Sequence, residues 1–451
     1  MRHRPPSHAT GLNGQDSICV THYARSLGFY EYPTIIAMPT TIHRARWIVP
    51  VEKPPIENGR LIVENGCIVA VEGSTGPAAG EFDHGDSVIL PGFVNAHTHL
   101  ELIHLRGRVP LRGSFVRWVE DLVALRMLDQ PEADQIAAIR QGIDLSLAAG
   151  VTAIGDIGCC PHAVKAWSGA DPWITGYLEV LGMGPRKAAP HRQSFDTMVS
   201  ACNRAPATDR CRVGLSPHAP YSVDASIYRH AVDYVKTTGR PLCTHLAETR
   251  EELQFLADGT GPLRDLLERW GLWDGSFATP GCSPVEYMRR LGLLDCRPLL
   301  VHVNYASDQD LETLSRHDCH VAFCPRSHDF FGHGPHRWRD MLRSGINVCV
   351  GTDSLASNDS LSVLDELRFL RRQDHTAAPQ ILLRMGTLAG ARALEVEAVC
   401  GSLSPGKSAD FVVLPLSAPG AKDPAADALD AETTISAVYL RGQLVLRKQL
   451  V

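Results

Sequence analysis

The sequence lacks the features that would attach a protein to a membrane or to nucleic acid. No apolar run in its 451 residues approaches the ~20 residues that cross a bilayer. Acidic residues outnumber basic residues by 50 to 44, which gives a net charge of −6 and leaves no basic excess for binding phosphates. We therefore expect no membrane and no nucleic acid among the partners of this protein.

Paired cysteine motifs are also missing. The 13 cysteines include no Cys-x-x-Cys pair, which argues against a zinc ribbon and a thioredoxin-like motif. A chain of this length can bury a large core without disulfides, so we expect reduced thiols and a cytoplasmic location. The first 37 residues lack the layout of a signal peptide, and regular alternation begins only near Met38. We interpret residues 1–40 as a poorly ordered N-terminal extension or a start-site artefact.

Two patterns divide the rest of the chain. Residues 41–92 and 395–451 contain short segments rich in Ile and Val, separated by turn signals such as Asn65-Gly66. Residues 93–394 instead alternate short apolar strands with helical stretches. The eight strands that we count there span residues 93–97, 151–157, 174–180, 212–216, 242–245, 299–303, 320–324 and 347–351.

Eight strands that alternate with helices over ~300 residues are the number needed for a closed barrel. We therefore predict an α/β fold: a (β/α)8 TIM barrel over residues 93–394, with a small discontinuous β-sandwich built from the two flanking segments. The rival fold, an open doubly wound sheet, should carry a Gly-rich phosphate loop after its first strand. In this chain the first strand is followed by His-Thr-His instead.

Histidine is the abundant functional residue, with 20 copies, and several histidines stand at strand ends, where barrel enzymes build active sites. His97 and His99 are two residues apart, so both imidazoles can face the barrel axis. His245 ends the fifth strand, His302 ends the sixth, and Asp353 follows the eighth. Imidazoles and one carboxylate suit Zn²⁺, or Fe²⁺ and Mn²⁺ by ligand type. The set predicts a site for one divalent metal, with Zn²⁺ preferred.

Two acidic residues in this set are candidates for proton transfer. Glu248 lies three residues after His245, where it can reach a substrate rather than the metal, and it is the natural proton shuttle. Asp353 can bind the metal and can also accept a proton from the attacking water. We therefore predict a hydrolytic reaction in which both carboxylates take part.

Four motifs, in their order along the chain, resemble the amidohydrolase superfamily. They are Pro-Gly-Phe-Val-Asn-Ala-His-Thr-His (91–99), His-Leu-Ala-Glu-Thr (245–249), Val-His-Val-Asn-Tyr (301–305) and Gly-Thr-Asp-Ser (351–354). Residues 401–414 are similar to the C-terminal β-sandwich of that superfamily, so the likeness extends from about Thr41 to the end. The resemblance implies that His97, His99, His245 and Asp353 bind one metal, that Glu248 shuttles the proton, and that His302 orients the water.

Within the superfamily, the pattern resembles the mononuclear branch of aromatic deaminases and chlorohydrolases. The dinuclear branches bridge two metals with a carboxylated lysine on the fourth strand, and residues 212–218 contain no lysine. A different class of zinc deaminases needs a Pro-Cys-x-x-Cys motif, which this chain lacks.

Five residues are candidates for substrate binding: Glu101, His218, Arg326, His328 and Ser354. His218 lies in a segment that resembles the substrate-contacting strand of nucleoside deaminases. Residues 324–333 resemble the subset that deaminates aminodeoxyfutalosine, a compound with a 6-aminopurine, a ribose and a benzoate. Arg326 could bind the benzoate carboxylate, or it could form an ion pair at the rim. The long segment 271–284 is interpreted as a substrate-covering lid or a subunit contact.

The resemblance implies a small-molecule substrate and allows a homodimer, because dimers are common among similar proteins. The implied reaction is deamination of an aminopurine nucleoside, with conversion of 6-amino-6-deoxyfutalosine to futalosine and ammonia, a step of menaquinone biosynthesis, as the preferred hypothesis. The alternatives are deamination of adenosine, methylthioadenosine or S-adenosylhomocysteine, and amino- or chlorohydrolysis of guanine-like or s-triazine rings. A non-catalytic scaffold of the same fold is a remote alternative, because the ligand positions and Glu248 are all present.

Overall fold

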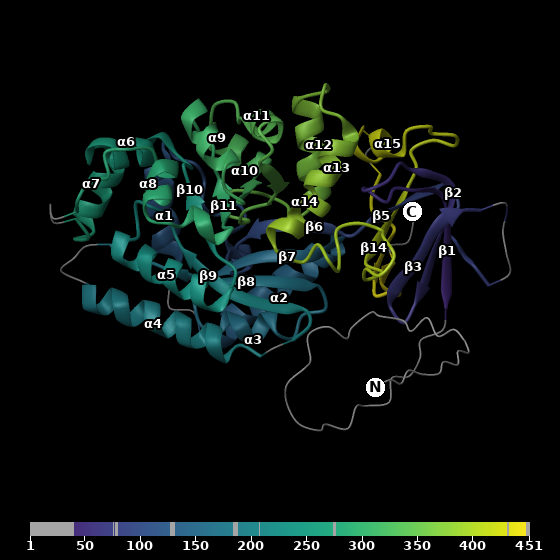
Figure 1. Cartoon of the computed structure of the whole chain (residues 1–451), viewed down its shortest axis with the longest axis horizontal. Coiled ribbons are helices and arrows are strands. Elements are labelled where there is room, and N and C mark those ends of the chain that lie inside the picture. The colour runs from purple at the N-terminus through teal and green to yellow at the C-terminus, as the bar shows by residue number, and fades with distance from the viewer. Residues whose placement is uncertain are drawn as a thin grey trace, which may run out of the picture.

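The computed structural model describes residues 40–74, 76, 80–126, 131–183, 188–206, 208–273, 277–430 and 433–447. Figure 1 shows an elongated molecule with a β-rich part at one end and a mixed α/β part at the other. The predicted N-terminal extension, residues 1–40, lies outside the described residues except for Thr40.

The eight strands predicted for the barrel are present, and each bound lies within one residue of its predicted place. They form two parallel sheets of four strands each. The first sheet contains β6 (Phe93–Thr98), β7 (Val151–Gly158), β8 (Trp173–Val180) and β9 (Cys211–Pro217), and the second contains β10 (Cys243–Leu246), β11 (Leu299–His302), β12 (His320–Phe323) and β13 (Asn347–Val350). Their carboxyl ends carry the polar residues singled out above.

The two sheets adjoin at both edges. Leu215 of β9 forms an isolated parallel bridge with Leu242, which lies just before β10. At the opposite edge, the Thr352 N–H donates to the His97 carbonyl oxygen of β6 at 3.0 Å. Within the described residues, no continuous ladder joins β13 to β6. The core is therefore of TIM-barrel type, although closure by a full ladder is not observed.

Helices cover the outer faces of the two sheets (Figure 1). The helices described between residues 93 and 394 are α1 (Phe115–Arg126), α2 (Glu132–Ala148), α3 (Ala163–Trp167), α4 (Ala188–Arg204), α5 (Ala225–Thr238), α6 (Arg250–Asp258), α7 (Pro262–Arg269), α8 (Pro284–Arg290), α9 (Asp308–Ser315), α10 (Pro325–Phe330), α11 (Trp338–Arg343), α12 (Val363–Gln373), α13 (Pro379–Met385) and α14 (Leu388–Ala393), with 3₁₀ turns η1 (Leu100–Leu105) and η3 (Leu294–Cys296). Side chains cap several of them: Thr249 accepts from the Glu252 N–H at α6, and Ser307 forms a capping box with Asp310 at α9.

Strands from both ends of the chain share one further sheet, in the order β16-β15-β14-β5-β1-β2-β3 with β4 beside β1. The strands are β1 (Thr41–Ile48), β2 (Ile56–Glu64), β3 (Cys67–Gly73), β4 (Phe82–Asp83), β5 (Ser87–Pro91), β14 (Phe411–Pro415), β15 (Ala437–Leu440) and β16 (Gln443–Arg447), and α15 (Pro424–Asp430) lies between β14 and β15. Val413 of β14 lies opposite Ile89 of β5 in an antiparallel pair. A second sheet facing this one is not among the described strands, so the sandwich and the bounds of the domains remain predictions.

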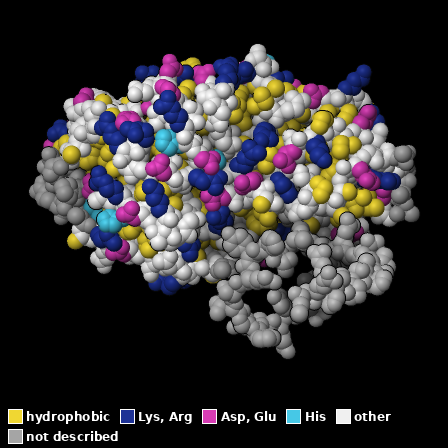
Figure 2. Space-filling view, in the orientation of Figure 1, with side chains coloured by type: hydrophobic (Ala, Val, Ile, Leu, Met, Phe, Trp, Pro, Cys, Tyr) yellow, Lys and Arg dark blue, Asp and Glu magenta, His cyan; other side chains and the backbone are white. Residues whose placement is uncertain are grey.

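None of the helices in the described ranges is long and apolar enough to cross a membrane. Figure 2 shows basic and acidic side chains mixed over the visible face, with no extended basic patch. The cysteines of the described ranges are all free thiols. The cytoplasmic location stays a prediction.

Candidate active site

The four histidines of the predicted site lie together at the carboxyl ends of β6, β10 and β11. His97 is the penultimate residue of β6 and His99 precedes η1, and their ring centroids are 4.9 Å apart. The ring of His245 lies 5.1 Å from that of His97 and 5.5 Å from that of His302. Strand pairing accounts for the position of His302, because this residue of β11 lies opposite Leu246 of β10. All four side chains are buried.

Backbone strain is concentrated at this rim. Ala247, His302, Val303 and Asp353 are not glycine, yet their φ angles are 50°, 72°, 50° and 57°. A left-handed conformation of this kind costs ~1–3 kcal/mol per residue and persists only where the surrounding structure requires it. Here the sharp turns direct side chains of β10, β11 and the segment after β13 into one cavity.

The donor atoms of the predicted ligands converge on one point. His97 Nε2 and His99 Nε2 lie 3.6 and 3.9 Å from Asp353 Oδ1, and His99 Nε2 lies 3.3 Å from His245 Nε2. Both ring nitrogens of His97 and Nδ1 of His99 are buried without a hydrogen-bond partner. Buried nitrogens are seldom left unpaired, so their convergence with a carboxylate fits a bound divalent metal ion.

Neighbouring groups fix the orientation of these ligands. The His245 Nδ1–H donates to the His218 carbonyl oxygen at 3.0 Å, which leaves Nε2 to face the cavity. Asp353 Oδ2 accepts hydrogen bonds from Ser327 Oγ at 2.7 Å and from Ser357 Oγ at 2.8 Å. The carboxylate therefore cannot rotate away from the histidines without breaking both bonds.

Burial sets the protonation states that a metal site needs. It lowers the pKa of His245 to about 3 and holds the pKa values of His99 and His302 well below their ordinary value, with the neighbouring imidazoles adding to the effect. Burial alone would raise the pKa of Asp353, but the adjacent imidazoles of His97 and His302 hold it well below its usual range. The site thus combines the neutral imidazoles of His99, His245 and His302 with the ionised carboxylate of Asp353 at neutral pH.

Glu248 differs from Asp353 in its electrostatics. Burial, together with the charges of Asp353 and Glu252, raises the pKa of Glu248 well above its ordinary value. Its Oε1 lies 3.5 Å from His302 Nε2, and Asn304 Nδ2 donates to its backbone carbonyl oxygen at 3.0 Å. A buried carboxyl group whose pKa is raised in this way is suited to act as a proton donor.

A cavity of about 270 Å³ opens beside these residues. Its polar lining includes His99, His218, His245, Glu248, His302, Asp353, Ser354, Arg126 and Glu179, and its apolar lining includes Leu102, Phe115, Trp118, Leu122, Leu266 and Trp270. The apolar side chains come from η1, α1 and α7 and from the residue after α7. The cavity therefore joins a polar floor, which holds the predicted site residues, to an apolar mouth.

Two of the five predicted substrate-binding residues line this cavity. His218 contributes its imidazole, whose Nδ1 lies 2.6 Å from Ser222 Oγ, and burial lowers its pKa to about 3. Ser354 follows the metal-site aspartate and lines the same wall.

The other three predicted substrate-binding residues have their side chains engaged elsewhere. Arg326 forms an ion pair with the exposed Asp359, which agrees with the alternative prediction of an ion pair at the rim. His328 uses both ring nitrogens, with Asn304 Oδ1 at 3.0 Å and the Gly334 carbonyl oxygen at 2.7 Å. Glu101 is paired with Arg126. None of the three belongs to the cavity lining in the described structure, and their substrate contacts stay predictions.

Sequence reasoning missed two charged residues of the cavity, Arg126 and Glu179. Arg126 ends α1 and pairs with both Glu101 and Glu179, the latter at 3.3 Å. Burial alone would lower the pKa of Arg126, but the two carboxylates raise it well above its usual range. Glu179 Oε1 is buried without a partner. Its place near the end of β8 was a usable signal, whereas nothing in the sequence pointed to Arg126.

The segment predicted as a lid, residues 271–284, divides between cavity and core. Leu272 lines the cavity, next to Trp270. Trp273 instead packs its ring 5.5 Å from that of Phe255 and 5.6 Å from that of Phe277. Residues 274–276 lie outside the described residues, and the proposed subunit contact stays a prediction.

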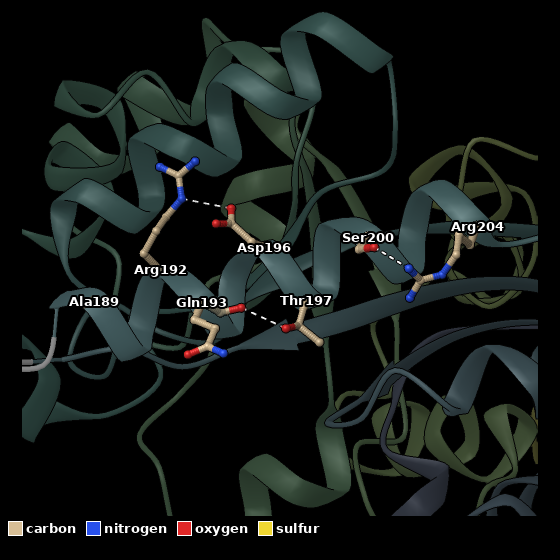
Figure 3. A pocket seen from close by; sticks show the side chains of 7 residues that line it. All are labelled: Ala189, Arg192, Gln193, Asp196, Thr197, Ser200 and Arg204. Carbon is tan, nitrogen blue, oxygen red and sulfur yellow. Dashed lines mark hydrogen bonds and ion pairs between the residues drawn. The ribbon is translucent and has the colours of Figure 1, made fainter.

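A second hollow, on α4, has no comparable chemistry (Figure 3). Its polar side chains pair along the helix: Arg192 Nε with Asp196 Oδ1 at 2.9 Å, and Arg204 Nη1 with Ser200 Oγ at 2.5 Å. No buried titratable group lines it. The cavity beside Glu248 is therefore the candidate active site.

Comparison with known proteins agrees with this geometry. Residues 88–445 match the model of the amidohydrolase family. The aminodeoxyfutalosine deaminase of Deinococcus radiodurans is 31% identical over 347 residues, which cover 72% of this chain and 80% of that protein. The 5-methylthioadenosine/S-adenosylhomocysteine deaminase of Moorella thermoacetica is 28% identical over 388 residues, 82% of this chain and 85% of that protein.

Among solved structures, a zinc-bound adenosine deaminase from Xanthomonas campestris superposes with a TM-score of 0.76 at 22% identity, covering 90% of this chain and 93% of the other. The chain belongs to the amidohydrolase family, as its motifs predicted. It is an enzyme, a hydrolase that acts on C–N bonds.

Glu252 offers a test of how the site is held in shape. Its two carboxylate oxygens accept the N–H groups of Ala247 and Glu248, each at 2.9 Å, and burial raises its pKa to about 7. In Glu252→Gln the amide NH₂ cannot accept a hydrogen bond, so one of the two bonds is lost. We expect the free energy of unfolding, measured in urea, to fall by about 1–3 kcal/mol, and kcat to fall with it. The half-buried neighbour Glu251, changed to Gln, should leave both values nearly unchanged.

Proposed function

We propose that this enzyme is a metal-dependent purine-nucleoside deaminase that replaces the 6-amino group of its substrate with oxygen and releases ammonia. The observation that carries the proposal is the position of Glu248. Its carboxyl group, whose pKa is raised by burial, faces His302 in a cavity whose floor is the cluster of His99, His245 and Asp353. The relatives named above are deaminases of adenine nucleosides and related compounds, which supports the same reaction class.

The metal would be held by His97, His99, His245 and Asp353, with Zn²⁺ as the proposed ion. When bound there, a divalent ion supplies a water of lowered pKa that can act as a nucleophile at neutral pH. The remaining chemistry falls to the protein side chains.

Proton transfer is assigned to three side chains. Glu248 donates its proton to the ring nitrogen next to the carbon that carries the amino group, which makes that carbon electrophilic. Neutral His302, 3.5 Å from Glu248, orients the attacking water, and Asp353 accepts a proton from it. Glu248, ionised by this first transfer, then takes the proton that Asp353 accepted and carries it to the amino group, which leaves as ammonia. The proton of the added hydroxyl group returns to Glu248 as the C–O double bond forms. Water is consumed and ammonia is produced in equal amounts.

The particular substrate that we propose is aminodeoxyfutalosine, which would place the enzyme in menaquinone biosynthesis. It rests on the similarity to the Deinococcus radiodurans enzyme and on the aromatic residues Phe115, Trp118 and Trp270 at the cavity, which suit an aryl group. The position of Arg326 does not support this substrate, because the Arg326 guanidinium is paired with Asp359 outside the cavity lining.

A second candidate is methylthioadenosine. The cation of the cavity lining, Arg126, is already paired with two carboxylates, Glu101 and Glu179. A substrate carboxylate placed there would meet a group of net negative charge, which disfavours it. The apolar mouth suits a methylthio group at least as well as a benzoate ring.

Ammonia release across a panel of substrates tests these proposals. The panel contains aminodeoxyfutalosine, methylthioadenosine, S-adenosylhomocysteine, adenosine, guanine and a chloro-s-triazine, each assayed for kcat/KM with the metal-loaded enzyme. We expect the highest value for aminodeoxyfutalosine. A preference for methylthioadenosine would contradict the proposed substrate but agree with the proposed reaction. Turnover of the triazine alone would contradict the proposal that the substrate is a nucleoside.

A further inference from the structure

Two adjacent cysteines stand at the same rim as the active site. Cys159 and Cys160 directly follow β7, whose carboxyl end faces the cavity side of the first sheet. Their Sγ atoms are 3.4 Å apart, and both side chains are partly exposed free thiols. Among the cysteines within the described ranges, this is the pair whose sulfurs are in contact.

This cysteine pair is connected to the substrate cavity through Arg126. The Cys159 N–H donates to Glu101 Oε2 at 3.0 Å, and the Cys159 side chain interacts electrostatically with Arg126. Glu101 also pairs with Arg126 through its other oxygen. Arg126 in turn holds Glu179, and both of these residues line the cavity. A change at Cys159 therefore reaches the charged wall of the active site through direct contacts.

The contact between the two sulfurs favours oxidation of this cysteine pair. A hydrogen bond from the Cys159 thiol lowers the pKa of Cys160, so Cys160 is the more reactive of the two as a thiolate. The sulfurs must approach from 3.4 Å to the ~2.05 Å of a disulfide. Neighbouring Cα atoms, ~3.8 Å apart, are closer than the ~4.4–6.8 Å of an ordinary disulfide, so rotation of the side chains must be joined by distortion of the peptide between the two residues. A disulfide between neighbours in sequence is strained, and strained disulfides are readily reduced again.

We propose that Cys159 and Cys160 form a reversible disulfide when the enzyme meets a hydroperoxide, and that this disulfide weakens substrate binding. The Cys160 thiolate attacks the terminal oxygen of the hydroperoxide, and the O–O bond breaks. Cys160 keeps this oxygen as a sulfenic acid, and an alcohol, or water from hydrogen peroxide, is released. The Cys159 sulfur then attacks the Cys160 sulfur, the S–O bond breaks, and the hydroxide leaves as water with the Cys159 proton. Two thiols are oxidised, one peroxide is reduced, and a dithiol reductant reverses the change.

The loss of binding follows from the contacts of Cys159. Closing the eight-membered ring turns the Cys159 sulfur from Arg126 towards Cys160 and strains the backbone of Cys159, whose N–H, one bond outside the ring, holds Glu101. The interaction of Arg126 with this sulfur then weakens, and Glu101 loses part of its fixed position. Because Arg126 positions Glu179, we expect KM to rise more than kcat falls, by ~10-fold, the size of one lost hydrogen bond to a charged group. Arg126 and Cys159 are positioning residues in this scheme.

The experiment treats the metal-loaded full chain with hydrogen peroxide and follows two readouts. Peptide mass analysis without reduction should show the fragment containing both cysteines lighter by two hydrogens, and restored by dithiothreitol. KM, measured with the best substrate of the panel above, should rise on oxidation and return on reduction. The effect of the disulfide on KM rests on the proposed function, but the peptide mass does not. Absent turnover in the reduced enzyme would count against the function, and an absent cross-link would overturn this inference.

Single variants provide the controls. Cys160→Ser should keep the activity of the reduced enzyme and lose the reversible response of KM to peroxide. Cys282→Ser removes another partly exposed thiol and should respond as the parent enzyme does. If Cys160→Ser still shows the same reversible rise of KM, or if the cross-linked parent keeps its KM, the proposal is wrong.

Discussion

Glu248→Gln is expected to bind metal as the parent enzyme does and to lose turnover by ~10²–10⁴-fold, the range in which a general acid contributes. The amide is close in shape to the protonated carboxyl group, so the buried contacts with Asn304 and the loop after β10 should survive. It cannot give up a proton to a ring nitrogen and then carry one to the leaving amino group. The loss should therefore appear in kcat, with KM little changed.

The measurement combines elemental analysis of the bound metal with steady-state ammonia release. Glu268→Gln, at an exposed position on α7, is the matched control and should keep full turnover. Near-normal kcat in Glu248→Gln would remove this residue from proton transfer. Loss of metal together with turnover would instead place Glu248 among the ligands.

His245→Ala should lose both the metal and the activity. His245 Nε2 lies 3.3 Å from His99 Nε2, and its Nδ1–H is already committed to the His218 carbonyl oxygen. Removing the imidazole takes away one nitrogen donor of a set of four ligands, and alanine offers nothing in its place. Metal affinity should fall by more than the ~10–100-fold seen when only an outer partner of a ligand is lost.

Metal content per chain, measured after dialysis against a mild chelator, decides this prediction. His375→Ala changes an exposed histidine and should leave both metal and turnover in place. Added Zn²⁺ at high concentration should restore part of the activity of His245→Ala, because the other three ligands remain. Full metal occupancy in this variant would exclude His245 from the ligand set.

The clustering of the predicted ligands was predictable because it depends on short-range rules. His97 and His99 share a face by the two-residue period of a strand, and His245, His302 and Asp353 come at or next to the ends of apolar strands whose bounds fell within one residue of their predicted places. Parallel strands bring such ends to one rim, so strand pairing alone collects these side chains. The resemblance to the amidohydrolase superfamily rested on the same residues.

The substrate wall was less predictable because it depends on where helices turn their side chains. The sequence suggested that Arg326 binds a substrate carboxylate. In the structure, α10 begins shortly after β12 and directs the Arg326 guanidinium to Asp359. His328, two residues along the same helix, uses both nitrogens in local bonds. Arg126, at the end of α1, became part of the cavity although its local sequence carries no signal.

The sequence by itself determined the alternation of strands and helices, the order of the histidines and acids, and thus the class of chemistry, since these follow from backbone periodicity and donor type. Tertiary structure alone decided which charged side chains line the cavity. It placed Arg126 between Glu101 and Glu179 and set Cys159 against that cluster. Such contacts join residues far apart in the chain. They depend on how the helices pack on the sheet, and a local sequence pattern does not contain this information.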